Sequence, residues 1–245
     1  MKRNLVFSLL LLAGLTAAQQ KPGDSVVVDP DHHRVVLENE HVRVIEARAS
    51  RGATSQMHSH PPFVFISLDA ARGKFGLPDG KSMIFDTNPN QVVWFGDGMQ
   101  HSWELIGGEV NVIGVEIKSA APGATKPAPV TRRADDCVTV DPDVHHVLFE
   151  NDQVRVFEAR AGKGRKSPMH SHVASLLVVT RKARMKGTAP NGATGYLDFT
   201  PNQVLWFPNG MQHAWEVIEG DLGVVVVEVK SAHKNPGPAA PAKAD

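Results

Sequence analysis

VVVDPDHHRVVLENEHVRVIEARA, at residues 26–49, decides the fold, because it returns as VTVDPDVHHVLFENDQVRVFEARA at residues 138–161. The offset of 112 residues also carries MHSH at residues 57–60 onto MHSH at residues 169–172. Repeats of this length are whole domains rather than the units of a solenoid. The sequence therefore predicts two copies of one small domain.

The two copies align without internal insertions. PNQVVWFGDGMQHSWE at residues 89–104 matches PNQVLWFPNGMQHAWE at residues 201–216 at the same offset. Residues 120–136, between the copies, are rich in Pro and Ala and lack apolar periodicity, which is typical of a linker. A similar segment at residues 232–245 is expected to be a disordered tail. We expect the two domains at residues 25–119 and 137–231.

Within each copy, β-branched and aromatic residues form short segments that Gly, Pro, Asn or Asp interrupt at intervals of about 8–12 residues. In the first copy these segments are residues 42–47, 63–68, 91–95 and 110–118. No long helical periodicity competes with them. An all-β domain protects its sheet edges by closing into a barrel or a sandwich. The sequence predicts an all-β fold with two tandem antiparallel β-barrels joined by a Pro/Ala-rich linker.

The composition excludes some partners. The chain has 245 residues, of which 42% are hydrophobic, enough for two domains with cores of their own. Lys plus Arg equals Asp plus Glu at 26 each, so no basic stripe is available to neutralise nucleic-acid phosphates. The single cysteine, Cys137, has no partner for an internal disulfide, and we interpret it as a small buried or linker-edge residue.

The first residues predict export. Lys2 and Arg3 precede an apolar run from Leu5 to Leu15, and small residues follow at 16–18. This is the pattern of a signal peptide at residues 1–18, and the run is too short for a membrane span. We expect a periplasmic or extracellular protein without membrane contact after cleavage; the alternative is an uncleaved N-terminal anchor.

Six of the twelve histidines lie in the repeated motifs. His58 and His60 are two residues apart, a spacing that places both rings on one face of a strand. His101 follows a Gly-rich turn, where a neighbouring strand brings a third ring. The second copy repeats the set, so the predicted metal ligands are His58, His60, His101, His170, His172 and His213.

The ligand type points to a transition metal. Neutral imidazole suits Zn, Cu, Fe and Ni, whereas Ca and Mg prefer oxygen ligands. We expect a divalent ion, Fe, Mn, Zn, Ni or Cu, held by three histidines with coordination positions left open for chemistry. The alternative, partly buried structural histidines, is disfavoured because both copies keep all three while residues 61–76 and 173–188 differ widely.

Other repeated residues have weaker assignments. Four are interpreted as pocket wall or as partners that orient the metal ligands, with core packing and turn hydrogen bonds as the alternatives: Trp103, Trp215, Gln100 and Gln212. Four histidines near expected strand starts are interpreted as surface residues: His32, His33, His145 and His146. Two glutamates are interpreted as salt-bridge partners of Arg48 and Arg160, or else as inward-facing ligands: Glu46 and Glu158.

These motifs resemble those of the cupin superfamily. The order of strand, His-x-His, strand and Pro-x-Gly-x-x-His is similar to the two cupin motifs, and the duplication resembles a bicupin. The second copy has the second motif intact from Pro208 to His213, whereas the first has Gly96 in place of the proline, which favours the second copy if one site is active. The resemblance covers nearly all of the chain after residue 18. It implies two jelly-roll barrels, or double-stranded β-helices, with a metal in each mouth.

The chain departs from the family at one ligand. A glutamate usually follows the second histidine by four or five residues, but Val64 and Phe65 stand there in the first copy and Leu176 and Leu177 in the second. The remaining three-histidine set is similar to that of the cupin thiol dioxygenases.

Three functions remain open. The first is a metalloenzyme, a dioxygenase-like oxidoreductase or an isomerase, acting on a small organic molecule. The second is a non-catalytic cupin that binds a small ligand, and the third is a module in which the metal braces the barrel. We expect a monomer, with a homodimer as the alternative.

Overall fold

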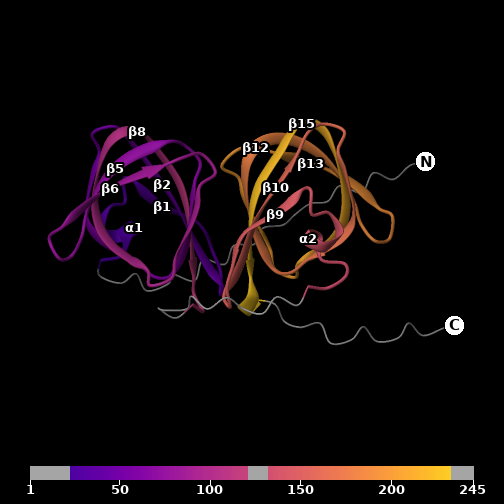
Figure 1. Cartoon of the computed structure of the whole chain (residues 1–245), viewed down its shortest axis with the longest axis horizontal. Coiled ribbons are helices and arrows are strands. Elements are labelled where there is room, and N and C mark those ends of the chain that lie inside the picture. Colours follow the sequence, from indigo (N-terminus) through magenta and orange to yellow (C-terminus); the bar gives the residue numbers. More distant parts are fainter. Residues whose placement is uncertain (1–22, 121–131, 233–245) are drawn as a thin grey trace.

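The computed structural model describes residues 23–120 and 132–232 of the chain. The predicted signal peptide, most of the linker and the tail lie outside these residues. Each described segment forms an antiparallel sheet that closes into a barrel, and the two barrels lie side by side (Figure 1). We call them barrel 1 (residues 23–120) and barrel 2 (residues 132–232).

Barrel 1 contains one short helix and eight strands. The elements are α1 (Ser25–Val28), β1 (His33–Glu38), β2 (Val42–Ser50), β3 (Thr54–His60), β4 (Phe63–Ser67), β5 (Ala71–Gly76), β6 (Ser82–Thr87), β7 (Val92–Phe95) and β8 (Met99–Ile117). The four segments that the sequence predicted as strands all lie in strands, in β2, β4, β7 and β8.

Barrel 2 repeats this order with one strand fewer. The elements are α2 (Cys137–Val140), β9 (His145–Glu150), β10 (Val154–Ala161), β11 (Lys166–His172), β12 (Ser175–Thr188), β13 (Thr194–Phe199), β14 (Val204–Phe207), β15 (Met211–Val229) and the 3-10 turn η1 (Lys230–Ala232). The count differs because β12 is continuous where barrel 1 has β4 and β5.

The long last strand closes each barrel. The C-terminal half of β8 pairs with β2 and β4, and its N-terminal half pairs with β3 and β5. In barrel 2, β15 pairs with β10, β11 and β12 in the same way. One strand therefore takes part in both layers of its barrel, and it carries the third predicted histidine at its start.

One hydrophobic cluster spans both barrels, and each barrel has a further cluster of its own. A single cluster of buried residues includes Val42 and Val64 of barrel 1 together with Val156 and Leu176 of barrel 2. At its edge, the hydroxyl oxygens of Ser119 and Ser231 lie 2.6 Å apart. These two serines are equivalent positions of the repeat, so they mark an approximate two-fold axis between the barrels. The described part of the chain contains no helix that is long and apolar enough to cross a membrane.

Candidate metal centre

Strand pairing brings the predicted histidines together in both barrels. His58 on β3 lies directly opposite His101 on β8, with ring centroids 4.5 Å apart. The centroids of His58 and His60 are 5.1 Å apart. In barrel 2, His170 lies opposite His213 at 4.8 Å and is 4.9 Å from His172.

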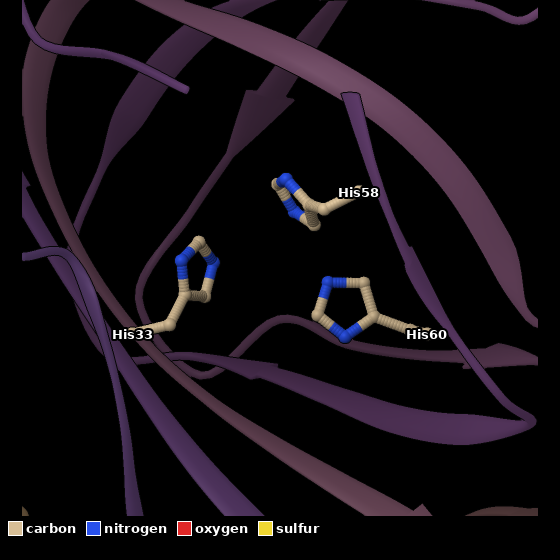
Figure 2. Close-up of side chains that lie close together, drawn as sticks. All are labelled: His33, His58 and His60. Atoms are coloured by element: carbon tan, nitrogen blue, oxygen red, sulfur yellow. The ribbon is translucent and has the colours of Figure 1, made fainter. Parts of the chain in front are cut away.

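A fourth histidine enters each group from the first strand. His33, at the start of β1, lies 4.9 Å from His58, and Figure 2 shows its ring facing those of His58 and His60. His145, at the start of β9, lies 4.9 Å from His170. Both side chains are buried, so their interpretation as surface residues was wrong.

The two other histidines interpreted as surface residues lie outside these groups. His146 is exposed, as predicted. His32 is half-buried, and one of its ring nitrogens lies 2.8 Å from a carboxylate oxygen of Asp29.

The closest nitrogens differ between the barrels. In barrel 2, His170, His172 and His213 offer ligand atoms that all lie within 4.8 Å of one another, which is the predicted set. In barrel 1 the corresponding group is His33, His58 and His60, so His33 takes the place that was predicted for His101. A third group, in barrel 2, adds Cys137 to His145 and His172.

Backbone carbonyls fix the orientation of the most buried rings. The Nδ1 atom of His58 lies 2.8 Å from the carbonyl oxygen of Gln56, and that of His170 lies 2.7 Å from the carbonyl oxygen of Pro168. Because a carbonyl oxygen only accepts, Nδ1 carries the proton and Nε2 keeps a free lone pair. Both Nε2 atoms are buried without a hydrogen-bond partner. Metal-ligating histidines are held in this way.

The fourth ring has the same kind of support. His33 Nδ1 lies 3.3 Å from the carbonyl oxygen of Asp29, and His145 Nδ1 lies 3.0 Å from that of Asp141. The contact therefore recurs at equivalent positions of the repeat and leaves the Nε2 atom of each ring available as an acceptor or ligand.

A buried chain of charges supports the second histidine of each motif. In barrel 1, His60 Nδ1 lies 3.3 Å from Glu116, whose other oxygen lies 3.5 Å from Arg43. Arg43 also donates to both carboxylate oxygens of Asp24, at the N-terminus of α1. The guanidinium group is thus placed between two carboxylates, one of which contacts a ring of the histidine group.

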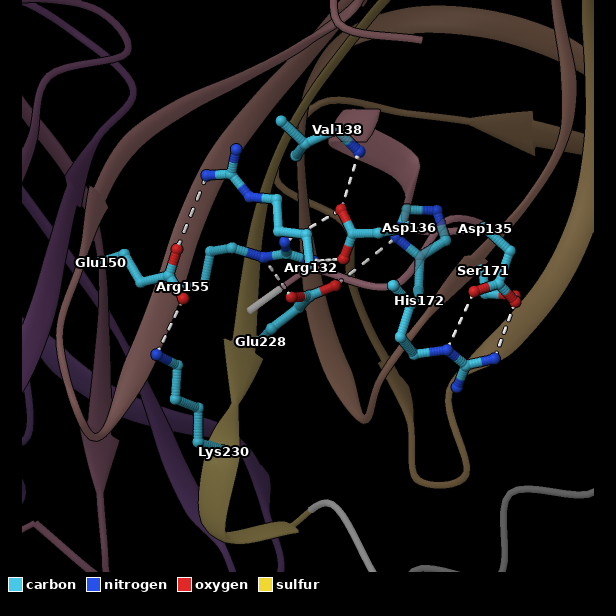
Figure 3. Close-up of polar contacts among 11 residues, drawn as sticks. Arg132, Asp135, Asp136, Val138, Glu150, Arg155, Ser171, His172, Glu228 and Lys230 are labelled. Atoms are coloured by element: carbon cyan, nitrogen blue, oxygen red, sulfur yellow. Dashed lines mark hydrogen bonds and ion pairs between the residues drawn. The ribbon is translucent and has the colours of Figure 1, made fainter. Parts of the chain in front are cut away.

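Barrel 2 contains the equivalent chain, shown in Figure 3. Arg155 donates to Glu228 at 2.6 Å and to Asp136 at 3.0 and 2.7 Å. His172 Nδ1 lies 3.7 Å from Glu228. Although burial opposes ionisation, His172 and Arg155 hold the pKa of Glu228 below its usual range.

Burial favours the neutral form of several of these histidines. Together with neighbouring imidazoles, it lowers the pKa of His33 and His145 to about 4. It lowers the pKa of His101 and His213 to about 2 for the same two reasons. Neutral imidazole is the form that binds metal ions, so no proton has to be removed at neutral pH.

The glutamates considered as replacement ligands are engaged elsewhere. Glu46 is buried but accepts hydrogen bonds from Arg34 and, at 2.8 Å, from Arg48. Glu158 pairs with Arg160 at 2.7 Å. The predicted salt bridges are present in both copies, and neither carboxylate belongs to a histidine group of the described residues.

The two tryptophans and two glutamines interpreted as pocket wall or as orienting partners differ in exposure. Trp103 and Trp215 are buried, and each lines the cavity inside its barrel together with the histidines. Gln100 and Gln212 are exposed and line neither barrel cavity. Successive residues of a strand point to opposite faces, so the glutamines turn outward where His101 and His213 turn inward.

Sequence reasoning missed His33 and His145 because no second histidine lies near them at a ligand spacing. A signal was nevertheless available, since the two residues occupy the same position of the repeat. The pairing of β1 with β2, and of β2 with β8, carries the start of β1 to the histidine group, and residue spacing does not show such pairing.

Comparison with known proteins supports the fold. No protein-family model matches the sequence, and no curated protein matches it. An oxalate decarboxylase structure superposes with a TM-score of 0.54 at 15% identity, covering 80% of this chain and 72% of the other. A variant of the Bacillus subtilis oxalate decarboxylase gives 0.52 at 15% identity, with the same coverage. A cupin 2 conserved barrel domain protein from Leptotrichia buccalis gives 0.48 at 13% identity, covering 81% and 88%.

The chain therefore has the fold of the cupin superfamily, in its duplicated, bicupin form. The two tandem antiparallel barrels and the cupin resemblance that the sequence motifs predicted are confirmed. Among the described residues, barrel 1 holds one group of three residues that could bind a metal ion, and barrel 2 holds two.

Proposed function

We propose that the protein is a metal-dependent bicupin that binds and transforms a small organic molecule at histidine-bound divalent ions. One observation carries the proposal: in both barrels the most deeply buried histidine has its Nδ1 atom on a backbone carbonyl and its Nε2 atom buried without a partner. An unpartnered buried nitrogen is costly unless something binds it. A metal ion is a suitable occupant because two further imidazoles face the same space.

The donor set limits the metal. Imidazole ligands suit Fe, Zn, Ni or Cu. Mn is a further candidate because the Bacillus subtilis oxalate decarboxylase, which is similar in fold, is described as having Mn(II) centres. The ion would supply Lewis acidity or oxygen activation to a bound molecule. His33, His58 and His60, with His101 beside them, would hold it in barrel 1; His170, His172 and His213, with His145, would do so in barrel 2.

A purely structural role is the second candidate. It is favoured by the fourth histidine, because four protein ligands complete the tetrahedral shell that is typical of structural zinc. In that case the ion braces the barrel and carries no open position. The two roles differ in whether water or substrate reaches the metal, so they can be separated by measurement.

Metal analysis tests the proposal. We expect native protein to carry one divalent ion per barrel, and His58→Ala together with His170→Ala to remove nearly all of it. His146→Ala is the matched control, since His146 is an exposed histidine outside both groups. Full occupancy in the double variant would contradict the ligand sets.

A second measurement separates catalysis from bracing. With Mn(II) in the sites, enhanced relaxation of water protons is expected if a coordination position is open. Oxygen uptake with small thiols, diketones and phenolics then screens for turnover. Tightly held metal that gives neither enhanced water-proton relaxation nor oxygen uptake favours the structural role.

We also propose that the protein is exported, with cleavage after residue 18, and that it acts as a monomer in the periplasm or outside the cell. The positive residues, apolar run and small residues at the start of the sequence support export. The core shared by the two barrels supports a monomer, because an apolar face of each barrel is already covered within one chain. Amino-terminal sequencing of the mature protein and its mass in solution test the two statements.

A further inference from the structure

Each barrel encloses a cavity next to its histidines, and the two cavities differ. The cavity of barrel 1 has a volume of about 90 Å³ and is lined by His33, His60 and His101. The cavity of barrel 2 has a volume of about 50 Å³ and is lined by the equivalent His145, His172 and His213. A molecule in either cavity would therefore contact the candidate metal site of that barrel.

Aromatic rings form one continuous part of the wall in barrel 1. The lining includes Trp103 and the phenylalanines at positions 63, 65, 75, 85 and 95. Phe75 stacks on Phe85 with centroids 5.1 Å apart and reaches His101 at 4.6 Å. Phe63 stacks on Phe95 at 4.8 Å. The wall thus continues from the aromatic rings directly to the imidazoles.

Small residues leave the space open in barrel 1. Gly73, Thr87 and Gly114 line its cavity. At the equivalent positions, barrel 2 has Met185, Phe199 and Val226, and all three line the smaller cavity. Barrel 2 also has Gly187 and Leu197 where barrel 1 has Phe75 and Phe85. Larger side chains have filled barrel 2, and the rings that remain in its lining besides the histidines are Phe157, Phe199 and Trp215.

The cavity of barrel 1 has no charge of its own. Its lining contains no Lys, Arg, Asp or Glu. The hydroxyl of Thr87 already contacts the backbone of Asp69 and Ala71. The imidazoles and whatever they bind are therefore the polar partners that remain for a ligand. The lining offers an anion no cationic side chain, so only an ion held by the histidines would offset the hydration that a carboxylate loses here.

We infer that barrel 1 is the ligand-binding barrel and that its ligand is a small uncharged aromatic molecule of about one ring, with a polar substituent directed at the histidines. The inference rests on the proposed function, since the histidine site gives the substituent its partner. Ring walls favour offset or edge contacts with an aromatic ligand. The cavity of about 90 Å³ is smaller than the apolar cavity of roughly 150 Å³ that takes up benzene, but it is not closed, so a one-ring ligand would lie partly in the cavity and partly at its mouth. This reverses the preference for the second copy that Pro208 suggested.

Ligand binding to the full-length, metal-loaded protein tests the inference. The probe is p-cresol, which is uncharged at pH 7 because its pKa is about 10, like that of the tyrosine side chain. Saturation-transfer NMR and calorimetry give its affinity, with oxalate as the charged comparison. The decisive variant combines Thr87→Phe and Gly114→Val, which give barrel 1 two residues of barrel 2. A Cβ atom at Gly114 would lie 3.8 Å from its nearest neighbours, so the position has room for a side chain.

We expect p-cresol to bind and the double variant to lose affinity for it at least tenfold with unchanged metal content, whereas the affinity for oxalate, which would contact the metal and not the ring wall, should change less than twofold. Val226→Ala, at the equivalent position of barrel 2, is the matched control and should change the affinity for p-cresol less than twofold. Metal-loaded protein that does not bind p-cresol overturns the inference. So does undiminished binding in the double variant.

A second variant covers the case in which the double variant does not fold. Phe85→Ala removes a half-buried ring from the wall, and it should extend binding to the two-ring probe 2-naphthol. No gain for 2-naphthol in that variant counts against barrel 1 as the binding barrel. Metal content is measured on every sample. Protein that binds p-cresol but never metal would refute the proposed function and leave the apolar ligand class standing.

Discussion

Barrel 1 and barrel 2 contain the same chain of histidine, glutamate and arginine, but the glutamate lies at different distances from its two partners. In barrel 1 the inner glutamate, Glu116, is nearer to the histidine, at 3.3 Å, than to the arginine, at 3.5 Å. In barrel 2 the equivalent Glu228 lies 2.6 Å from Arg155 and 3.7 Å from His172. The carboxylate thus orients a ring in barrel 1 and mainly holds an ion pair in barrel 2.

The cavities of the two barrels also differ. Barrel 1 keeps open space beside its histidines, whereas barrel 2 fills that space with larger side chains. Larger side chains in a cavity add packing contacts at the expense of space for a ligand. The comparison suggests a division in which barrel 1 binds and barrel 2 stabilises, and the following variants test it.

Replacing the buried arginine should have the largest effect, and a larger one in barrel 2. Arg155→Met leaves the buried Glu228 and the half-buried Asp136 without their partner, so we expect a loss of about 3–5 kcal/mol in the free energy of unfolding. Arg43→Met should cost about 1–2 kcal/mol less, because Glu116 keeps its contact with His60. Urea unfolding followed by circular dichroism measures both losses.

Arg51→Met is the control for the arginine variants, since Arg51 is exposed and its replacement should change stability by less than about 0.5 kcal/mol. Equal losses for the two buried arginines would show that the balance of charges is the same in both barrels.

The turn before the third histidine should be equally sensitive in both barrels. Gly98 and Gly210 have φ values of 73° and 67°, and a Cβ atom would lie 2.3 Å from the carbonyl oxygen of His60 or 2.2 Å from that of His172. Replacement of either glycine by alanine should cost about 2–3 kcal/mol and lower metal occupancy in that barrel alone, since a ligand residue must move.

Gly80→Ala separates strain from contact at these turns. Gly80 also has a positive φ, of 81°, but nothing lies within 4 Å of the position that a Cβ atom would take there, so we expect a cost of about 1 kcal/mol. A cost as large as that at Gly98 would show that backbone strain, and not the clash with the carbonyl oxygen of His60, causes the loss of stability.

Acid should destabilise the metal-free protein through both histidine groups. Folding lowers the pKa of His33 and His145 from 6.5 to about 4, so between these pH values the unfolded chain binds more protons than the folded chain. The free energy of unfolding therefore falls as pH falls from about 6.5, by up to about 1.4 kcal/mol per pH unit for each such residue.

Denaturation between pH 7 and pH 5 measures this slope. His33→Asn and His145→Asn should each make it shallower by a similar amount, whereas His146→Asn should not. A slope that neither buried-histidine variant changes would mean that other groups cause the acid sensitivity.

The smallest expected effect on stability comes from exchanging a single side-chain atom, oxygen for sulfur. Ser25 in barrel 1 and Cys137 in barrel 2 are equivalent and buried, but the Ser25 hydroxyl has no hydrogen-bond partner. Ser25→Cys should therefore stabilise the protein by about 1 kcal/mol, and Cys137→Ser should destabilise it by a similar amount. Thermal unfolding measures both, and changes of the same sign would contradict this explanation.

Much of the architecture could be predicted. The repeat indicated two domains, short β-branched segments indicated the strands, and the spacing of His58 and His60 indicated a pair of rings on one strand face. The pairing of His58 with His101 was also predictable in outline, because a turn precedes the third histidine. The fourth histidine was not, because it reaches the group through contacts between distant parts of the chain, which include the pairing of β1 with β2 and an isolated bridge between Asp24 and Ser59 of β3.

The sequence by itself determined the duplication, the all-β class and the histidine spacing, because these depend on local periodicity and on identity between the copies. Only the tertiary structure decided which nitrogens converge, which carbonyls orient them and which barrel keeps open space. Those properties arise from side chains far apart in the chain, such as Phe75, Thr87 and Gly114, whose combined volume sets the cavity. Packing is a property of the folded neighbourhood, and residue spacing does not contain it.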